Sequence, residues 1–323
     1  MINNHTSPGL KPGAGIKPGA GSPSRAKIIL AFLAIYIIWG STYLFIRFGV
    51  ASIPPFMMAG TRFIFAGLFL YFWNRRRGVP APTRIQWRSA AIVGALLLLI
   101  GNGGLSWAEQ AIPSGVTALL ISTSPIWFVL LDWIWFGGKR PAGRVVAGLA
   151  LGLAGVVWLI GPDNIIHGGG FPLSGLLVLM LATGSWAAGS LYSRRAILPA
   201  SHSMATGMEM VAGGVLLYAL SALTGEPWRV DPATVTLKSM LAVGYLSVFG
   251  SLVAFSAYVW LLRVVPASRV STYAFVNPLI AVFLGWTLGG EEFSSRVGIA
   301  ALIIVAGVVL IVLRPAAARE AEA

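Results

Sequence analysis

The sequence predicts an all-α polytopic membrane protein whose ten transmembrane helices form two inverted five-helix repeats. The first observation is composition: of 323 residues, 57% are apolar and only 10% are charged, whereas soluble domains are about 25% charged. The second is a series of apolar stretches of about 20 residues, each long enough to cross a hydrocarbon core about 30 Å thick as a helix. The third is that the second half of the chain repeats the pattern of the first. The stretches do not alternate polar and apolar residues as the strands of a membrane β-barrel do.

The predicted transmembrane helices follow the apolar stretches in order. Only residues 110–113 separate the third stretch from the fourth, and Glu109, Pro113 and Gly115 supply a turn there. The expected spans are 28–47, 55–73, 90–109, 114–136, 142–160, 173–194, 203–222, 237–260, 269–287 and 296–313.

Polar segments flank these helices. Residues 1–27 are rich in Gly, Pro and Ser and include several basic residues, so we expect a disordered cytoplasmic arm. The first apolar run, 28–46, exceeds the 7–15-residue core of a signal peptide, and no small-residue cleavage site follows it, so we expect a retained helix. Residues 314–323 form a predicted cytoplasmic tail.

The basic residues predict the orientation in the membrane. The formal net charge is +13, but these residues come in short clusters between the spans and are not interleaved with exposed aromatic residues, which argues against nucleic acid as a partner. In alternate loops, one side holds the clusters at 75–77, 139–144 and 194–195, whereas the other holds few basic residues. By the positive-inside rule, both termini lie in the cytoplasm.

The chain matches itself at a fixed offset. A shift of 147 residues pairs Trp39 with Trp186 and continues into the next helix, where Gly60 meets Gly207 and Gly67 meets Gly214. A shift of 153 then pairs prolines and tryptophans of the later helices. Because each unit has an odd number of spans, the second unit enters the membrane from the opposite side. This inverted repeat is common in secondary transporters, whose substrate sites lie near the midplane between the repeats.

Arg62 and Glu209 are the charged residues that stand out within spans. The 147-residue shift pairs them, and each lies roughly 10 Å in from its surface at 1.5 Å per residue, on opposite sides of the midplane. Charges at such depth are expensive in lipid, so both must face protein or water. Three hypotheses remain open: the pair fixes helix packing, it binds the carboxylate or ammonium of a zwitterionic substrate, or Glu209 couples transport to protons.

Further polar and helix-breaking residues are candidates for the same site. Pro125 and Pro278 remove a helix hydrogen bond in mid-span and should bend their helices as packing bends or hinges. The side chains beside them and the polar and aromatic residues of other spans are candidates to line a cavity, although aromatic residues near span ends more often belong to the interfacial belt. These candidates are Ser124, Asn277, Asn102, Tyr43, Trp107, Tyr258 and Tyr273.

Enzymatic chemistry lacks its usual residues. The chain has no cysteine, and its three histidines, His5, His167 and His202, lie in the arm, in a loop and at a loop edge. No metal site, cofactor site or nucleotide-binding motif is therefore predicted. Without a nucleotide site, transport would be driven by a gradient or by the membrane potential. A membrane-embedded enzyme and a non-transporting receptor or scaffold are the alternatives.

Three motifs together resemble the EamA family of the drug/metabolite transporter superfamily. They are Tyr36-Ile-Ile-Trp-Gly-Ser-Thr-Tyr43, the Pro-Pro-Phe-Met-Met-Ala-Gly-Thr-Arg-Phe of residues 54–63, and Tyr273-Ala-Phe-Val-Asn-Pro278. The likeness covers roughly residues 28–314 and rests on the order of the motifs and the duplicated five-helix plan. The two units also differ, since Trp-Gly-Ser-Thr-Tyr in the first reads Trp-Ala-Ala-Gly-Ser in the second.

This resemblance implies a ten-helix carrier with two EamA units, 28–160 and 173–313, that exports small metabolites such as amino acids, or drugs, by alternating access. It implies a multi-pass protein of the bacterial inner membrane with the lipid bilayer and a small-molecule substrate as partners. Protons as a coupling ion and a homodimer stay open. The small-residue pattern Gly148–Gly152 is more typical of packing within one chain than of a dimer.

Overall fold

The computed structural model describes residues 24–138, 140–161, 171–265, 267–270 and 272–312. The predicted tail at 314–323 and most of the predicted arm at 1–27 lie outside these residues. Arg25 to Lys27 belong to the first helix, which begins at Arg25. The described helices group into ten segments that cross the molecule, and seven of them are long and apolar enough to span a membrane.

The first five segments contain helices α1 to α8. The first joins α1 (Arg25–Leu33), η1 (Ala34–Ile38) and α2 (Trp39–Val50); the second is α3 (Pro55–Arg76); the third joins α4 (Arg84–Gly94), η2 (Ala95–Gly103) and α5 (Gly104–Ala108); the fourth contains α6 (Ser114–Ile121) and α7 (Ser124–Trp135); the fifth is α8 (Gly143–Ile160).

The last five segments contain helices α10 to α16. The sixth is α10 (Leu173–Ser193); the seventh is α11 (His202–Leu223), followed by the short turns η3 (Glu226–Trp228) and η4 (Pro232–Thr234); the eighth joins α12 (Leu237–Tyr245), η5 (Leu246–Phe255) and α13 (Ser256–Val264); the ninth contains α14 (Ala267–Val270) and α15 (Tyr273–Leu288); the tenth is α16 (Ser295–Val312).

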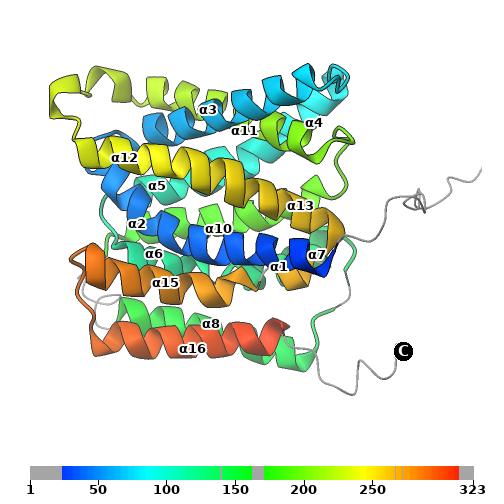
Figure 1. Ribbon diagram of the computed structural model, residues 1–323. Coiled ribbons are helices and arrows are strands. Elements are labelled where there is room, and N and C mark those ends of the chain that lie inside the picture. Colours follow the sequence, from blue (N-terminus) through cyan, green and yellow to red (C-terminus); the bar gives the residue numbers. More distant parts are fainter. Residues whose placement is uncertain (1–23, 139, 162–170, 266, 271, 313–323) are drawn as a thin grey trace, which may run out of the picture.

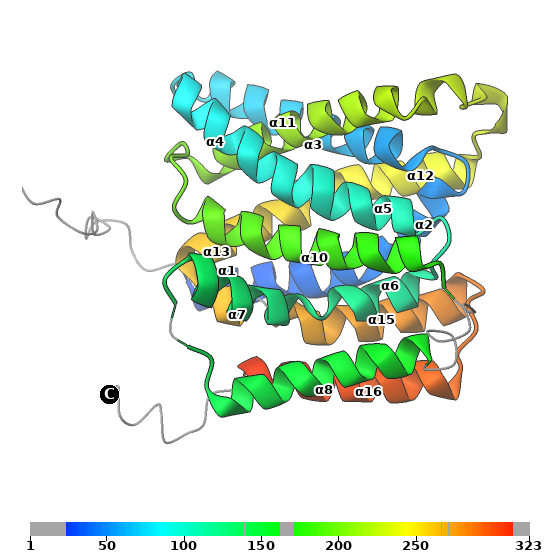
Figure 2. The same cartoon turned by 180° about the vertical axis from the view of Figure 1, so that it is seen from behind.

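The segments lie side by side with their axes nearly parallel (Figure 1). Corresponding helices of the two halves pair at the two edges of the bundle: α3 packs on α11 at one edge and α8 packs on α16 at the other. The remaining segments form the layers between these pairs, as the reverse view shows (Figure 2). We call the end of the bundle where α1 begins the terminal end, and the opposite end, where α2 connects to α3, the loop end.

The crossing of α3 and α11 displays the inverted repeat directly. A Cβ added at Gly67 would lie 2.8 Å from the carbonyl oxygen of Gly207, and one at Gly214 would lie 3.2 Å from that of Gly60. The 147-residue shift converts the first contact into the second, so the two are the same contact related by a twofold axis. Because the helices run in opposite directions, the predicted inverted architecture is confirmed. The glycines allow this backbone approach without a side chain between the helices.

Small residues also bring α8 and α16 together at the other edge. A Cβ added at Gly307 would lie 2.7 Å from the backbone nitrogen of Gly152 and 2.8 Å from the carbonyl oxygen of Gly148. The Gly148–Gly152 pattern therefore packs within the chain. The homodimer stays a prediction that this contact does not support.

Wider, π-helical turns occur at matching places in the third and eighth segments. They are η2 in the first half and η5 in the second, whereas η1 of the first segment has no counterpart in α10. Such turns are rare and gather at functional sites, because they leave backbone groups free and shift the register of the side chains. Here, η2 packs against α10 and η5 packs against α3, so each faces a helix of the other half.

The fourth segment is interrupted just before Pro125. α6 ends at Ile121 and α7 begins at Ser124, while the hydroxyls of Ser122 and Thr123 donate to the carbonyl oxygens of Leu119 at 2.6 Å and Leu120 at 2.7 Å. Pro125 therefore occupies the first turn of α7, where a missing N–H costs little. Pro278, in contrast, lies inside α15. Whether either acts as a hinge stays a prediction.

Two carboxylates of the second half cap helices of the first half at the loop end. Glu226 accepts from the backbone N–H of Phe56 at 3.1 Å and of Met57 at 2.8 Å, at the start of α3. Glu291 accepts from the N–H and hydroxyl of Ser114, both at 2.7 Å, and from the N–H of Gly115 at 3.1 Å, at the start of α6. A helix N-terminus has free N–H groups and a partial positive charge, so these caps are charge-assisted.

Candidate functional site

A cavity lies between the two halves of the chain. Both halves contribute side chains to it. Its free volume is about 60 Å³, which is room for several waters. We call it the central cavity. Its lining residues are Trp39, Thr42, Tyr43, Ile46, Arg62, Gly101, Asn102, Leu105, Ile121, Ser124, Ala182, Thr183, Trp186, Gly250 and Tyr273.

Arg62 supplies the charge of this cavity. It lies two turns into α3, where the cap on Phe56 and Met57 fixes the start of the helix, and its side chain is 3% exposed. Its Nη2 donates to the amide oxygen of Asn102 at 2.5 Å, and its guanidinium carbon lies 4.3 Å from the ring centre of Phe63. Nε and Nη1 have no hydrogen-bond partner among the described residues. The guanidinium is thus held by one neutral acceptor and keeps donors available.

Asn102 reaches this position because η2 carries it to the cavity. It lies between two glycines, and a Cβ added at Gly101 would lie 3.2 Å from the Trp186 ring. The small residues let η2 approach α10 closely, while the amide is directed at Arg62. The sequence analysis named Asn102 as a candidate because it is a polar residue within an apolar span.

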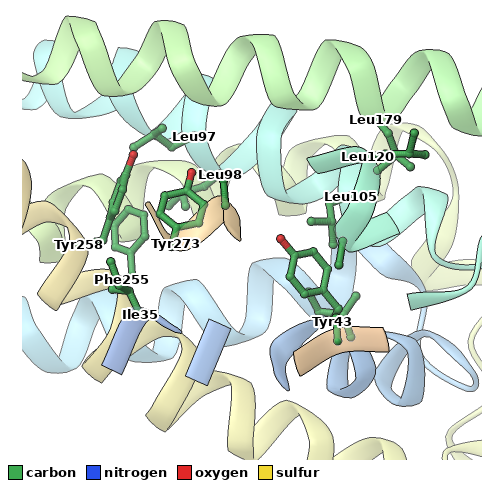
Figure 3. Packing of buried hydrophobic residues seen from close by; sticks show 14 of the residues in the cluster. Ile35, Tyr43, Leu97, Leu98, Leu105, Leu120, Leu179, Phe255, Tyr258 and Tyr273 are labelled. Carbon is green, nitrogen blue, oxygen red and sulfur yellow. The ribbon is translucent and has the colours of Figure 1, made fainter. Parts of the chain in front are cut away.

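Aromatic side chains close the cavity toward the terminal end. The ring of Trp39 lies 4.9 Å from that of Tyr258, 5.5 Å from that of Tyr273 and 5.6 Å from that of Trp186, centre to centre. The Tyr258 hydroxyl accepts from Trp186 Nε1 at 3.1 Å and lies 2.7 Å from the Ser190 hydroxyl. We call these residues, with Phe255, the aromatic plug. Tyr258 and Phe255 lie together in Figure 3, while Tyr43 stands apart beside Leu105 on the cavity wall.

Charged side chains lie beyond the cavity toward the loop end. Arg47 forms an ion pair of 3.5 Å with Glu291 and donates to the carbonyl oxygen of Ile112 at 3.2 Å. Glu109 is 1% exposed, and neither carboxylate oxygen has a hydrogen-bond partner among the described residues. Its charge acts on both Arg47 and Arg62. The sequence analysis treated Glu109 only as part of a turn; its place at the end of an apolar run, directly after a tryptophan and an alanine, was the available signal.

The structure brings together five of the predicted site residues. Tyr43, Arg62, Asn102, Ser124 and Tyr273 all line the central cavity. Trp186 and Thr183 line it as well and were not among the predicted site residues.

The other predicted residues lie elsewhere. Tyr258 is buried in the aromatic plug, and Trp107 lines a separate hollow at the loop end. Asn277 is 2% exposed; with its amide nitrogen as the donor, it reaches the carbonyl oxygens of Tyr36 at 3.0 Å and Tyr273 at 3.2 Å. That contact ties α15 to η1 and leaves the side chain outside the cavity lining.

Glu209 also lies outside the cavity lining. Its side chain is fully buried on α11, and neither oxygen has a hydrogen-bond partner among the described residues. Arg263 on α13 is the basic residue whose charge acts on it. Arg62 and Glu209 therefore do not pair with each other: Asn102 is the hydrogen-bond partner of the first, and Arg263 is the electrostatic partner of the second.

The family model described as "EamA-like transporter family" matches residues 26–161 and 173–313, which together make up most of the chain. The chain belongs to the EamA-like transporter family. It is accordingly a membrane transporter, and the expectation that it is not an enzyme is confirmed by this membership. The two matched regions correspond to the two halves that meet around the central cavity.

Individual relatives support the same assignment. The chain is 43% identical over 284 residues to the protein named "Uncharacterized inner membrane transporter YedA" of Escherichia coli K12, covering 88% of this chain and 90% of the relative. It is 25% identical to the "Probable amino-acid metabolite efflux pump" of the same organism, covering 88% and 94%. A crystal structure of a protein 20% identical to this EamA chain matches it with a TM-score of 0.62 over 88% of this chain and 97% of that one, and so shares its fold.

Proposed function

We propose that this EamA protein is a secondary transporter that exports small metabolites, such as amino acids or related compounds, or drugs, across the bacterial inner membrane by alternating access. One observation carries the proposal: a cavity lined by both halves of an inverted repeat contains a buried arginine with unused donors. Substrate sites of inverted-repeat carriers lie at the repeat interface near the midplane. The names of the two relatives, an inner membrane transporter and a probable efflux pump, support the location and the direction of transport.

The arrangement of the two ends supports an alternating mechanism. The aromatic plug lies on the terminal side of the cavity, and the Arg47–Glu291 ion pair lies on the loop side. A rocking of the halves that separates the plug would admit substrate from the terminal end, and one that separates the ion pair would release it at the loop end. Each step exchanges packed contacts for a wet cavity, as in two-state carriers.

Transport by purified protein in liposomes tests the function. A panel of amino acids and drugs is presented with an imposed pH gradient, and protein-dependent movement of at least one compound is expected. A receptor or scaffold, the alternative, would bind without moving any compound across the sealed bilayer. An effect of the pH gradient on the rate would identify protons as the coupling ion.

The orientation has its own test, because the chain contains no cysteine. Single cysteines replace Arg77, in the exposed turn after α3, and Ser294, exposed at the loop end. With both termini in the cytoplasm, a membrane-impermeant thiol reagent labels Ser294→Cys in intact cells and labels Arg77→Cys only after the membrane is opened. The reverse pattern would place the termini outside.

A further inference from the structure

The charge of the central cavity indicates what kind of molecule it binds. Among the fifteen lining residues, Arg62 alone carries a charge. Its side chain is 97% buried, and its Nε and Nη1 have no acceptor among the described residues. These nitrogens carry three N–H donors that Arg cannot give up, because the guanidinium stays protonated. A buried charge with free donors is costly unless an acceptor of opposite charge completes it.

The neighbours of Arg62 leave these donors without an acceptor. The charge of Glu109 acts on Arg62, but its carboxylate makes no hydrogen bond to the described residues and lies outside the cavity lining. Asn102 accepts one hydrogen bond through a neutral amide oxygen. The Ser124 hydroxyl donates to the carbonyl oxygen of Ile121, and that of Thr183 donates to Leu179 at 2.6 Å, so both are directed at their own helices. A carboxylate has the geometry and charge that a guanidinium binds best.

The remaining walls are apolar and aromatic. Trp39 and Trp186 present their rings to the cavity next to Tyr43 and Tyr273. Aromatic walls bury a flat or branched apolar body and stack against a ring in offset or edge-to-face geometry. A body of one ring or a short branched chain would suit these walls.

We infer that the central cavity selects a small organic monoanion, a carboxylate on an aromatic or branched apolar body, with the carboxylate bound by Arg62. The inference rests on the proposed function and names the substrate class for the same site. It also separates a monoanion from a zwitterion. No acidic side chain is among the lining residues, so an ammonium group there would have no carboxylate partner in the cavity wall.

Isothermal titration calorimetry on the purified full-length protein at pH 7.5 tests this with three related probes. They are 3-phenylpropionate, its neutral amide 3-phenylpropanamide, and the zwitterion phenylalanine, which share one ring and one chain length. We expect the acid to bind at least tenfold more tightly than either of the others. This comparison uses the wild-type protein alone and does not depend on a variant that folds.

Variants then assign the effect to one side chain. Arg62→Gln should weaken binding of the acid at least tenfold and leave binding of the amide unchanged. The affinity of Arg62→Lys for the acid should lie between those of the wild type and Arg62→Gln. Arg229→Gln, at an exposed arginine of the loop end, is the matched control and should bind all probes as the wild type does. Thermal unfolding checks that each variant is folded before titration.

Several results would overturn the inference. The inference is wrong if the amide equals the acid in wild-type affinity, if Arg62→Gln weakens acid and amide alike, or if none of the probes binds to folded wild-type protein. Equal binding of phenylalanine would assign a zwitterion site instead. A different result contradicts the proposed function. If the acid binds but no compound is transported in liposomes, the protein is not a transporter, although the binding site is supported. If compounds are transported without a preference for the acid, the transporter is supported and the inferred site is wrong.

Discussion

Arg62 and Glu209 occupy equivalent places in the two halves but have different surroundings. Each is the eighth residue of its helix, on α3 and α11, and each is almost fully buried. Arg62 lines the central cavity, whereas Glu209 does not. The repeat thus preserves the depth of a charged residue in the membrane but not its access to the cavity.

The charged residues next to Arg62 and Glu209 also have opposite signs in the two halves. Arg62 has an acid nearby, Glu109 at the end of the third segment, and Glu209 has a base nearby, Arg263 at the end of the eighth. Arg263 is about half-buried and donates to the carbonyl oxygen of Pro199 at 3.5 Å. The Arg62–Glu109 pair on the loop side and the Glu209–Arg263 pair on the terminal side thus carry swapped signs. We interpret the terminal-side pair as structural and the loop-side arginine as the binding group.

The side chains that accept hydrogen bonds at the starts of helices also differ between the two ends, since those at the loop end are charged and that at the terminal end is neutral. The loop end uses the carboxylates of Glu226 and Glu291 on helix N-termini. At the terminal end, the amide oxygen of Asn74 accepts from the hydroxyls of Ser201 at 2.9 Å and Ser203 at 2.8 Å, at the start of α11. Hydrogen bonds to charged groups are roughly twice as strong as neutral ones. The terminal end is therefore expected to separate at the lower cost.

The largest effect is expected where the two halves are most alike, at the glycine crossing. Gly67→Ala places a Cβ 2.7 Å from the backbone nitrogen of Val211, and Gly214→Ala places one 3.0 Å from that of Ile64. Because backbone cannot move aside as a side chain can, each should destabilise the protein by about 2 kcal/mol. Thermal unfolding in detergent measures the change.

The control for the crossing is Gly244→Ala on α12, where an added Cβ meets nothing within 4 Å. It should leave stability unchanged or raise it by up to about 1 kcal/mol through helix propensity. A large loss at Gly67 with none at Gly214 would contradict the twofold relation between the two contacts.

The next largest effect distinguishes the caps of the two ends. Glu291→Ala removes a carboxylate that accepts three hydrogen bonds and pairs with Arg47, and should cost about 2 kcal/mol. Asn74→Ala removes a neutral acceptor and should cost about 1 kcal/mol. Unfolding of both variants is compared with that of Glu292→Ala, an exposed neighbour expected to stay within about 0.5 kcal/mol of the wild type. Equal losses at Glu291 and Asn74 would remove the proposed asymmetry between the ends.

The sequence predicts the scaffold well because its signals are local or repeated. Span length, the positions of small residues and the 147-residue shift are all readable without knowing which helices touch. The shift matches Gly60 with Gly207 and Gly67 with Gly214, but their contact at the crossing of α3 and α11 was not predicted and is seen only in the structure.

The site is predicted less completely because it depends on which helices are neighbours. Nothing in the run around Glu209 indicates that it lies outside the cavity lining, since its burial and its position in the helix match those of Arg62. Glu109 escapes notice for the opposite reason: it follows the last helical residue of its segment and looks like a loop residue. Tyr43 and Trp186 line the cavity from α2 and α10, helices of opposite halves whose proximity is not readable from the sequence.

A smaller effect is expected from the hydroxyls of two buried tyrosines. Tyr258→Phe in the aromatic plug loses the contacts of its hydroxyl with Trp186 and Ser190 and should cost about 1 kcal/mol of stability. Tyr43→Phe in the cavity wall is the matched control and should change stability little, because its hydroxyl makes no hydrogen bond to the described residues that would be lost. Thermal unfolding of both variants is the measurement. A larger loss for Tyr43→Phe would mean that the hydroxyl facing the cavity holds the structure together.

The smallest effect on transport is expected from Glu209→Gln. The change keeps the shape of the side chain and removes the charge of a buried carboxylate that has no hydrogen-bond partner among the described residues. Because Glu209 does not line the cavity, initial transport rates in liposomes should stay within about twofold of the wild type at every imposed pH gradient. Glu292→Gln, at an exposed position, controls for the loss of one acidic group.

The contrary result would be specific. If Glu209→Gln transports at the wild-type rate without a gradient but no longer responds to one, Glu209 is the coupling carboxylate. Arg263, whose charge acts on it, would then be the residue that stabilises its ionised form. In that case the two halves would have different roles: Arg62 would bind the substrate on the loop side, and Glu209 would carry the proton on the terminal side. If the pH response is unchanged, the Glu209–Arg263 pair serves only in helix packing, and Arg62 remains the residue proposed to bind the substrate.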